Sequence, residues 1–269
     1  MSDTTLINPV KKRLLAGDVA LGMSVRLSRS ADVARIAKAT DHDFIFIDTQ
    51  HSIFNLETIN HMAQTALAIG IAPVVRVKSV NDPDVSLLLD NGVTGIVYPD
   101  INTAVEARRA VEVCRFAPIG RRSVAGGYVH FDFKPVPFSQ ATAALNDVCL
   151  LVCMIETAEG LANLEEICAV PGIDVIHMGT GDYAASIGKA GQFDDPEIVA
   201  AQARVIDVAR RHGKYAGCGG NRNVERQVSA IRAGARFVTT QTDASFLMTA
   251  AQLWTSGVRE ALARDAVLG

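Results

Sequence analysis

The sequence predicts an α/β protein, a single (β/α)8 barrel that spans residues 1–269 as one domain. Eight short apolar segments, each a predicted strand, alternate with eight predicted helices along 269 residues. An open doubly wound sheet is the alternative, but it usually needs fewer strands, and the chain has no glycine-rich dinucleotide fingerprint. No linker rich in proline, glycine or serine interrupts the alternation, so no domain boundary is expected.

The predicted strands share one pattern, a short run of Ala, Val, Ile, Leu or Phe that stops at a polar or turn-forming residue. Such runs are too apolar for half-exposed strands, which favours parallel strands buried on both faces. The predicted strands are Ala20–Val25, Phe44–Asp48, Pro73–Val77, Gly95–Tyr98, Val148–Ile155, Ile173–Met178, Tyr215–Cys218 and Phe237–Thr240.

Segments with a helical spacing of apolar residues follow each strand. Ser30 or Asp32 is a candidate N-cap of the first helix, and Gly213 and Gly234 stand where glycine commonly ends a helix. The predicted helices are Ser30–Ala39, Leu56–Ala68, Asp84–Asp90, Thr103–Cys114, Ala158–Ala169, Pro196–His212, Val224–Ala233 and Ala244–Arg264.

Residues 115–147 exceed what a barrel needs between its fourth helix and its fifth strand. Loops of this length usually carry function or form contacts between subunits. The insertion contains the cationic turn GRRSV, in which Arg122 is a candidate second anchor for a substrate. A solvated turn is the alternative interpretation.

Composition excludes several classes of protein. The net charge is −3 and no basic run is present, which argues against a nucleic-acid partner. The longest apolar runs are far shorter than a membrane span, and the first residues lack the apolar core of a signal peptide. The five cysteines include no CxxC pair and are expected to be buried thiols. A soluble, cytoplasmic protein without a membrane partner is predicted.

Two carboxylates, Glu156 and Asp182, stand just beyond the predicted ends of neighbouring strands. Barrel enzymes bind ligands at the carboxyl ends of their strands. Two converging carboxylates there favour a hard divalent cation such as Mg2+ or Mn2+. The alternative is that each residue caps a helix. His177 is close in sequence, but it lies within a strand and is expected to point elsewhere.

Three further residues lie at the same strand ends. Arg76 lies inside the apolar strand Pro73–Val77, and a buried arginine needs an anion, either a substrate carboxylate or enolate oxygen or a protein carboxylate. Asp48 and Glu156 are the candidate protein partners. His51 follows Asp48 by three residues and is a candidate general base, with an ordinary loop histidine as the alternative.

Two other features are weaker candidates. Asp90 ends a predicted helix, where the helix dipole disfavours an anion, so it is a candidate to pair with an imidazole. The turn Gly179-Thr180-Gly181 can present backbone N–H groups to a carboxylate or phosphate of a substrate.

These segments together resemble the HpcH/HpaI family of class II, metal-dependent pyruvate aldolases, which includes 4-hydroxy-2-oxoheptanedioate aldolase and 2-keto-3-deoxy-sugar-acid aldolases. The likeness extends from about Val10 to Leu262. It is carried by FIFIDTQHS, VVRVKSVNDPDVSLLLDNG, IVYPDINTAVEARRAV, GRRSV, MIETAEGLANLEEI and MGTGDYAASIG. The chain departs from the usual family pattern at Gln50, Met154 and Thr180.

The resemblance implies a (β/α)8 barrel that assembles as a homo-oligomer, a trimer or a hexamer, in which paired subunits exchange the last helix. It implies that Glu156 and Asp182 hold Mg2+, Mn2+ or Co2+, which chelates the carboxylate and keto oxygens of pyruvate. Arg76 would then stabilise the enolate oxygen. The implied reaction is the reversible cleavage of a 4-hydroxy-2-oxo acid to pyruvate and an aldehyde.

The resemblance also implies roles for the remaining candidates. His51, with Asp48 beside it, would accept the proton of the 4-hydroxyl group, directly or through water. Asp90 would polarise His51 across a subunit contact, and Arg122 aligns with the arginine of the corresponding family turn.

Three alternatives stay open. A related metal-dependent lyase could decarboxylate oxaloacetate or cleave an acyl-CoA such as citramalyl-CoA. A Schiff-base aldolase is less favoured, because no lysine is well placed: Lys78 lies just beyond Arg76 and shares its face only if the strand extends that far. A non-catalytic barrel that binds a keto acid is the third alternative.

Overall fold

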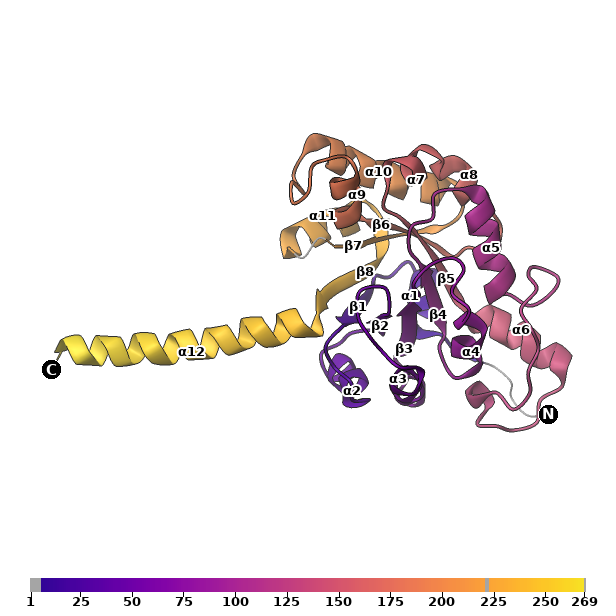
Figure 1. The fold of residues 1–269 in the computed structure, drawn as a ribbon, viewed down its shortest axis with the longest axis horizontal. Coiled ribbons are helices and arrows are strands. Elements are labelled where there is room, and N and C mark those ends of the chain that lie inside the picture. The colour runs from indigo at the N-terminus through magenta and orange to yellow at the C-terminus, as the bar shows by residue number, and fades with distance from the viewer. Residues whose placement is uncertain (1–5, 221–222, 269) are drawn as a thin grey trace.

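The structure, a computed structural model, describes residues 6–220 and 223–268 and is a closed barrel of eight parallel strands. Each strand pairs with the next in sequence, and β8 pairs with β1 to close the barrel (Figure 1). The strands are β1 Ala20–Val25, β2 Phe44–Asp48, β3 Ala72–Arg76, β4 Gly95–Tyr98, β5 Leu150–Ile155, β6 Val175–Gly179, β7 Tyr215–Gly219 and β8 Ala235–Thr242. The predicted fold class is confirmed.

The helices surround the strands and alternate with them along the chain (Figure 1). They begin with α1, which precedes β1, and end with α12, which follows β8. Their bounds are α1 Pro9–Leu15, α2 Asp32–Ala39, α3 Leu56–Ile69, α4 Val85–Asp90, α5 Ala104–Cys114, η1 Val129–Phe131, α6 Phe138–Val148, α7 Ala158–Ala162, α8 Leu164–Cys168, α9 Thr180–Ser186, α10 Pro196–Arg211, α11 Val224–Ala233 and α12 Asp243–Leu268.

The structure differs from the predicted elements in a few places. The predicted strand from Val148 begins later, because Val148 still belongs to α6 of the insertion. The single helix predicted after β5 divides into α7 and α8 at Asn163, whose side chain donates to the backbone oxygen of Asn102 at 2.8 Å. Helices α1, α6 and α9 were not predicted: α1 and α9 are too short to show a helical period, and α6 lies within the segment that was predicted to be a long loop.

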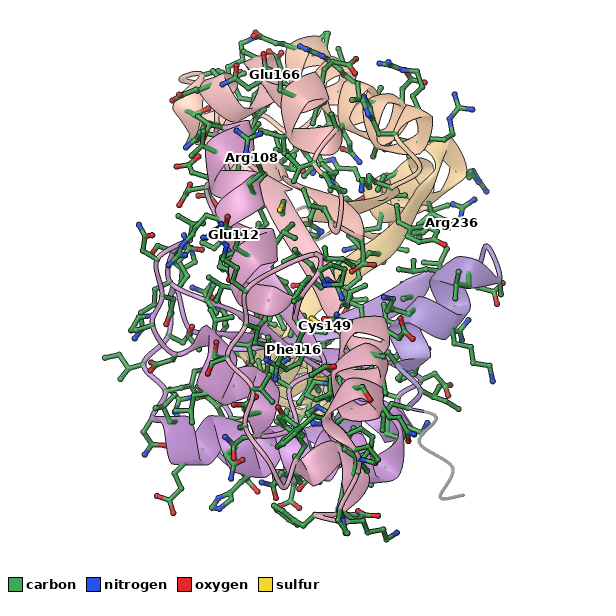
Figure 2. All side chains as sticks on the ribbon, turned by 90° about the vertical axis from the view of Figure 1, so that its right-hand side faces the viewer. Arg108, Glu112, Phe116, Cys149, Glu166 and Arg236 are labelled. Carbon is green, nitrogen blue, oxygen red and sulfur yellow. The ribbon has the colours of Figure 1, made fainter. Side chains whose placement is uncertain are left out.

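The insertion forms a small core of its own. Phe116, Tyr128 and Phe131 pack with side chains of α6. Figure 2 shows this side of the molecule, with Phe116 below the end of α5. The insertion therefore packs as an ordered unit at the end of the barrel where α5 finishes and β5 begins.

The barrel interior is filled with side chains at its amino end. Phe44 and Phe237 stack with ring centroids 4.4 Å apart. Val10 and Leu14 of α1 are buried in the same cluster. The Asn8 side chain, which caps α1, donates to the backbone oxygens of Thr94 and Val148 across the base of the barrel. The amino end is closed, so open space remains only toward the carboxyl ends of the strands.

Helix α12 extends away from the barrel (Figure 1). Seven large apolar side chains along it are exposed: Phe246, Leu247, Met248, Leu253, Trp254, Val258 and Leu262. Among the described residues, no helix is both long and apolar enough to cross a membrane. The predicted cytoplasmic location stays a prediction.

Replacing Gly22 by Ala should destabilise the barrel. A Cβ at Gly22 would overlap the buried ring of Phe44, which also stacks on the ring of Phe237. Overpacking of this kind costs about 1–3 kcal/mol of unfolding free energy, to be measured by urea denaturation. Gly126→Ala is the matched control, because nothing lies within 4 Å of the added carbon. Equal stabilities of the two variants would contradict the packing argument.

Candidate active site

A cavity of about 320 Å³ opens at the carboxyl ends of the strands. Six residues that the sequence singled out line it together: Asp48, His51, Arg76, Gly179, Gly181 and Asp182. Asp48 and Asp182 are 134 residues apart in the sequence. The closed barrel brings them and the residues between them to one rim. The remaining wall comes from β1, β5, β7 and β8, with Ser24, Met154, Gly219 and Thr239 among its residues.

Glu156 lies directly after β5 and is almost fully buried, at 2% exposure. One carboxylate oxygen, Oε1, accepts a hydrogen bond from the backbone N–H of Asp100 at 2.8 Å. The other, Oε2, is buried and has no hydrogen-bond partner among the described residues. Gly179 leaves room for it, because a Cβ there would collide with this carboxylate. The chain therefore keeps one oxygen of Glu156 available in a buried position.

Three carboxylates influence one another at this site. Burial raises the pKa of Glu156 to about 7; the hydrogen bond from Asp100 opposes the shift, and the charges of Asp100 and Asp182 add to it. Burial also raises the pKa of Asp100, and the charge of Asp182 adds to that shift. Like charges at close range favour a bound cation or a bound proton.

Asp100 was not predicted as a site residue, although it follows β4 at the same edge that supplied the other candidates. It adopts a φ of 52°, in the left-handed region that Asp tolerates better than most residues. Gln50 donates from Nε2 to Asp100 Oδ2 at 3.3 Å. The rule that found Asp48 and Glu156 would also have found Asp100.

The donor set fits a hard divalent cation. Glu156 supplies a buried oxygen without a partner, and Asp182 adds a second carboxylate at the cavity wall. The part of the chain that the structure describes holds no group of three or more His, Cys, Asp or Glu side chains able to enclose a metal. Mg2+ is commonly held by one or two carboxylates, with water and substrate oxygens as its other ligands. Glu156 and Asp182 suit that mode of binding.

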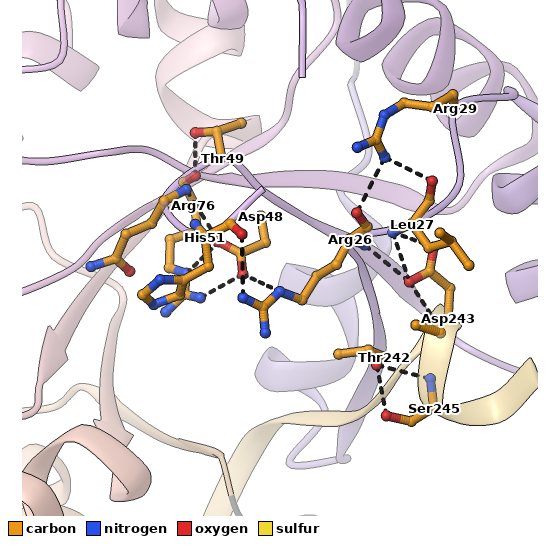
Figure 3. A network of polar contacts seen from close by, with 12 residues as sticks. Arg26, Leu27, Arg29, Asp48, Thr49, His51, Arg76, Thr242, Asp243 and Ser245 are labelled. Carbon is orange, nitrogen blue, oxygen red and sulfur yellow. Dashed lines mark hydrogen bonds and ion pairs between the residues drawn. The ribbon is translucent and has the colours of Figure 1, made fainter. Parts of the chain in front are cut away.

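Asp48 is the centre of a charged network at the mouth of the cavity (Figure 3). Arg76 donates to both of its oxygens, from Nε to Oδ1 at 3.0 Å and from Nη2 to Oδ2 at 2.6 Å. Arg26, from the end of β1, approaches Oδ2 with its Nε at 3.1 Å. Burial alone would raise the pKa of Asp48, but the bonds and charge of Arg76 outweigh it and lower the pKa.

The ion pair of Arg76 with Asp48 was one of the two alternatives considered for this arginine. Arg76 also lines the cavity, so the pair orients the guanidinium group without removing it from the wall. Arg26 was missed, although it too follows a strand directly. The mouth thus carries two arginines around one carboxylate.

The β1 loop is held by the first residue of α12. Asp243 accepts hydrogen bonds from the backbone N–H groups of Arg26 at 3.0 Å and Ser28 at 2.7 Å (Figure 3). Arg29 donates to the backbone oxygen of Leu27 at 2.8 Å in the same loop. Helix α12 therefore begins by fixing the loop that carries Arg26 to the cavity.

His51 is exposed and is one of the residues that line the cavity. Its backbone N–H donates to Asp48 Oδ1 at 3.3 Å, and Gln50 N–H donates to the same oxygen at 3.2 Å. Asp48 therefore shapes the loop that presents His51. Thr180 is buried beside the site, and its hydroxyl has no hydrogen-bond partner among the residues described.

The prediction that the His177 side chain points away from the site is wrong. Its side chain points into the barrel and lines the cavity, with 1% exposure. A strand buried on both faces gives no alternation of polar and apolar residues, so its sequence does not reveal which side chains face inward.

The structure does not bring Asp90 or Arg122 to this cavity. Helix α4 begins beyond β3 and ends with Asp90 beside the amino end of β4, so Asp90 lies at the opposite end of the barrel. Arg122 donates from Nη2 to Asp90 Oδ1 at 2.5 Å, and its guanidinium lies over the ring of Phe116. Within one chain, therefore, Asp90 pairs with an arginine and not with the imidazole of His51, and Arg122 is not placed to anchor a substrate.

A (β/α)8 barrel with carboxylates and arginines at the carboxyl ends of its strands is the architecture of a barrel enzyme. A sequence profile of the HpcH/HpaI aldolase/citrate lyase family matches residues 23–250. The chain is 32% identical over 246 residues to 4-hydroxy-4-methyl-2-oxoglutarate aldolase of Hapsidospora irregularis, covering 89% of this chain and 90% of that one.

Two further comparisons agree. The chain is 31% identical over 254 residues to the hydroxypyruvate/pyruvate aldolase of Cupriavidus necator, covering 94% of this chain and 93% of that one. The crystal structure of an HpcH/HpaI aldolase from Desulfitobacterium hafniense matches with a TM-score of 0.89 at 27% identity, covering 93% and 96% of the two chains. The chain belongs to the HpcH/HpaI aldolase/citrate lyase family. It is an enzyme, a carbon–carbon lyase, and the resemblance read from its sequence is confirmed.

Replacing Asp48 by Asn should destabilise the protein strongly at pH 7. The substitution leaves Arg76 buried without its carboxylate, and breaking a buried ion pair in this way costs about 3–5 kcal/mol. The folded-state pKa of Asp48 lies below its unfolded value, so its stabilisation is present above a pH of about 4 and is lost as pH falls through the folded pKa. Urea denaturation at pH 7 and pH 3 should show the difference between variant and wild type shrink in acid.

The matched control is Asp194→Asn. Asp194 forms a similar pair with Arg226 through Nε at 2.7 Å, but it is exposed to solvent. An exposed pair contributes little, so this variant should keep nearly the wild-type stability. Equal losses of unfolding free energy in the two variants would contradict the argument that burial makes the Asp48 pair important.

Proposed function

We propose that the protein is a divalent-metal-dependent class II aldolase that cleaves 4-hydroxy-2-oxo acids reversibly to pyruvate and an aldehyde. The observation that carries the proposal is the buried, unpartnered oxygen of Glu156, which lies against Gly179 of the cavity wall and feels the charge of Asp182. The name of the Hapsidospora irregularis relative, an aldolase of a 4-hydroxy-2-oxo acid, supports this substrate class.

Glu156 and Asp182 would hold Mg2+, Mn2+ or Co2+. When bound, the cation acts as a Lewis acid that lowers the energy of negative charge on the keto oxygen of the substrate. The carboxylates themselves neutralise part of its charge and fix its position at the wall of the barrel. The raised pKa of Glu156 is consistent with this role. Burial and the neighbouring carboxylates both disfavour its negative charge, and a bound cation would offset both effects.

Arg76 would bind the oxygens of the 2-oxo acid and stabilise the enolate oxygen, because its bond to Asp48 already fixes the plane of the guanidinium group. The backbone at Gly179-Thr180-Gly181 begins α9 and borders the cavity, where its N–H groups can receive the substrate carboxylate. The substrate would therefore enter with its oxo-acid end toward β3, β5 and β6.

His51 would accept the proton of the 4-hydroxyl group, directly or through a water molecule. Its place on the exposed rim gives it access to both solvent and cavity. Asp48 supports it by holding its backbone. In the reverse direction, the same imidazole would return the proton to the new hydroxyl group.

A second enzymatic function, decarboxylation of oxaloacetate or cleavage of an acyl-CoA such as citramalyl-CoA, would use the same enolate-stabilising groups. Arg26, a second arginine at the mouth, is compatible with a substrate that carries another anionic group. A Schiff-base mechanism is disfavoured because Lys78 is exposed and does not line the cavity of Arg76. A non-catalytic barrel is disfavoured by membership in a family of lyases.

Glu156→Gln and Asp182→Asn should each lower the cleavage rate of a 4-hydroxy-2-oxo acid by about 100-fold or more while the fold is retained. Each substitution removes a negative oxygen that the cation needs. Pyruvate release is measured with a coupled lactate dehydrogenase assay, using apo protein with and without added Mg2+, Mn2+ or Co2+. EDTA should abolish activity, and added metal should restore it.

Glu166→Gln on the exposed surface of α8 is the control and should keep full activity. Oxaloacetate is assayed in parallel, and faster turnover of oxaloacetate than of any 4-hydroxy-2-oxo acid would favour the second function. Undiminished rates in either metal-site variant, or full activity in EDTA, would disprove the metal-dependent mechanism.

Self-association of the chain, as a trimer or a hexamer, is part of the proposal. Helix α12 carries large apolar side chains that are mostly exposed, including Leu253 and Trp254 at 75% each. An apolar surface of this kind on an extended helix is typical of a contact between subunits. Exchange of α12 between paired subunits would cover it. Asp90 is far from His51 within one chain, so the predicted pairing of these two residues would require a contact between subunits.

Trp254→Glu should reduce the molar mass measured by light scattering after size exclusion. A buried charge at the centre of a subunit contact is unfavourable, so the oligomer should dissociate into smaller oligomers or monomers. Val199→Glu, at an exposed apolar residue of α10, is the control and should leave the mass unchanged. A monomeric wild type, or an unchanged mass for Trp254→Glu, would refute the role of α12.

A further inference from the structure

His177 is a buried polar side chain for which the proposed mechanism has no task. It projects from β6 into the barrel, is 1% exposed, and lines the same cavity as Arg76 and Met154. Its Nδ1 is buried without a hydrogen-bond partner among the described residues. An unpartnered polar atom in the interior is costly, so an imidazole kept here is a candidate for a functional role through its other nitrogen, Nε2.

The barrel is shaped around this imidazole. A Cβ at Gly217 would lie 2.5 Å from His177 Nδ1, and a Cβ at Gly219 would lie 2.6 Å from His177 Nε2. The ring meets Phe237 edge to face, with centroids 5.6 Å apart. Two glycines on β7 therefore leave the space that the ring occupies, and Phe237 fixes its orientation.

A second polar group points to the same place. The hydroxyl oxygen of Thr239 would lie 2.5 Å from a Cβ at Gly219. His177 Nε2 and Thr239 Oγ1 thus converge above Gly219, and all three residues line the cavity. We call this space the Gly219 notch. It offers hydrogen bonds to a small polar group of a ligand.

The imidazole is uncharged in the working pH range. Burial, together with the nearby charge of Arg76, lowers the pKa of His177 to about 3. A neutral imidazole has one donor and one acceptor nitrogen, and the threonine hydroxyl can also do either. This pair suits a hydroxyl group better than a carboxylate, which only accepts hydrogen bonds and would bring a charge.

The location of the notch indicates which part of the substrate would reach it. Arg76 and the carboxylates of Glu156 and Asp182 would engage the carboxylate and keto oxygen of a 2-oxo acid. C3 is then the part left facing the rest of the wall. Since the 4-hydroxyl group must face His51, a hydroxyl at the Gly219 notch belongs on C3.

We propose that His177 and the Gly219 notch bind a hydroxyl group on C3 of the 2-oxo acid, so that the site prefers a hydroxylated three-carbon keto acid to pyruvate. This inference rests on the proposed function for the orientation of the substrate. His177 would be a specificity-determining residue. Its replacement should change the ratio of the affinities for the hydroxylated and the plain keto acid, while the affinity for the plain keto acid changes little.

The test compares hydroxypyruvate with pyruvate, which differ only in this hydroxyl group. Their dissociation constants are measured by calorimetry with Mg2+ present, for wild type, His177→Phe and His177→Leu. The wild type should bind hydroxypyruvate more tightly, and both variants should lose about tenfold of that preference while their affinity for pyruvate changes little. Leucine needs less space than phenylalanine, so the preference can be measured with His177→Leu if His177→Phe is unstable.

Gly219→Ala should reduce the same preference, because the added carbon fills the notch. His61→Phe on the exposed face of α3 is the control and should keep the wild-type preference. Equal affinity of the wild type for the two acids, or an unchanged preference in the His177 variants, would overturn the inference. Aldol turnover with an aldehyde is measured separately, so that its absence contradicts the proposed function while the binding ratio still decides the role of His177.

Discussion

The buried pair of Asp48 with Arg76 is the interaction on which the rest of the site depends. An arginine inside a barrel needs a carboxylate, and Asp48 on the adjacent strand provides it through two hydrogen bonds. The same carboxylate receives Arg26 and the backbone of His51, so one side chain positions two arginines and the loop of the candidate base. The cationic side of the cavity is built around this single anion.

Negative charge gathers at the carboxyl ends of β4, β5 and β6. Burial raises the pKa of Glu156, and the charges of Asp100 and Asp182 add to the shift. An arrangement with arginine on one wall and carboxylates on another suits a ligand whose oxygens are shared between a cation and a guanidinium group. The missing side chains of Gly179 and Gly217 leave the space that Glu156 and His177 occupy.

The sequence predicted the barrel and most of the rim for one physical reason. A parallel strand buried on both faces is a short apolar run, so its end is visible, and Asp48, Arg76, Glu156 and His51 all stand at or just after such ends. Arg26 and Asp100 stand in equivalent places and could have been found by the same rule. His177 could not, because only the closed barrel decides that its side chain points inward while those of Ile176 and Met178 pack against the surrounding helices.

By itself, the sequence determined the order of strands and helices, the residues at the strand ends, and the family through its motifs, since all of these are local properties of the chain. Only the tertiary structure decided which of those residues meet. It joined Asp48 with Arg76 and Arg26, turned His177 into the cavity, and left Asp90 with Arg122 at the other end of the barrel. Contacts of this kind depend on strand register and barrel closure, which involve residues far apart in the chain and leave no local signal.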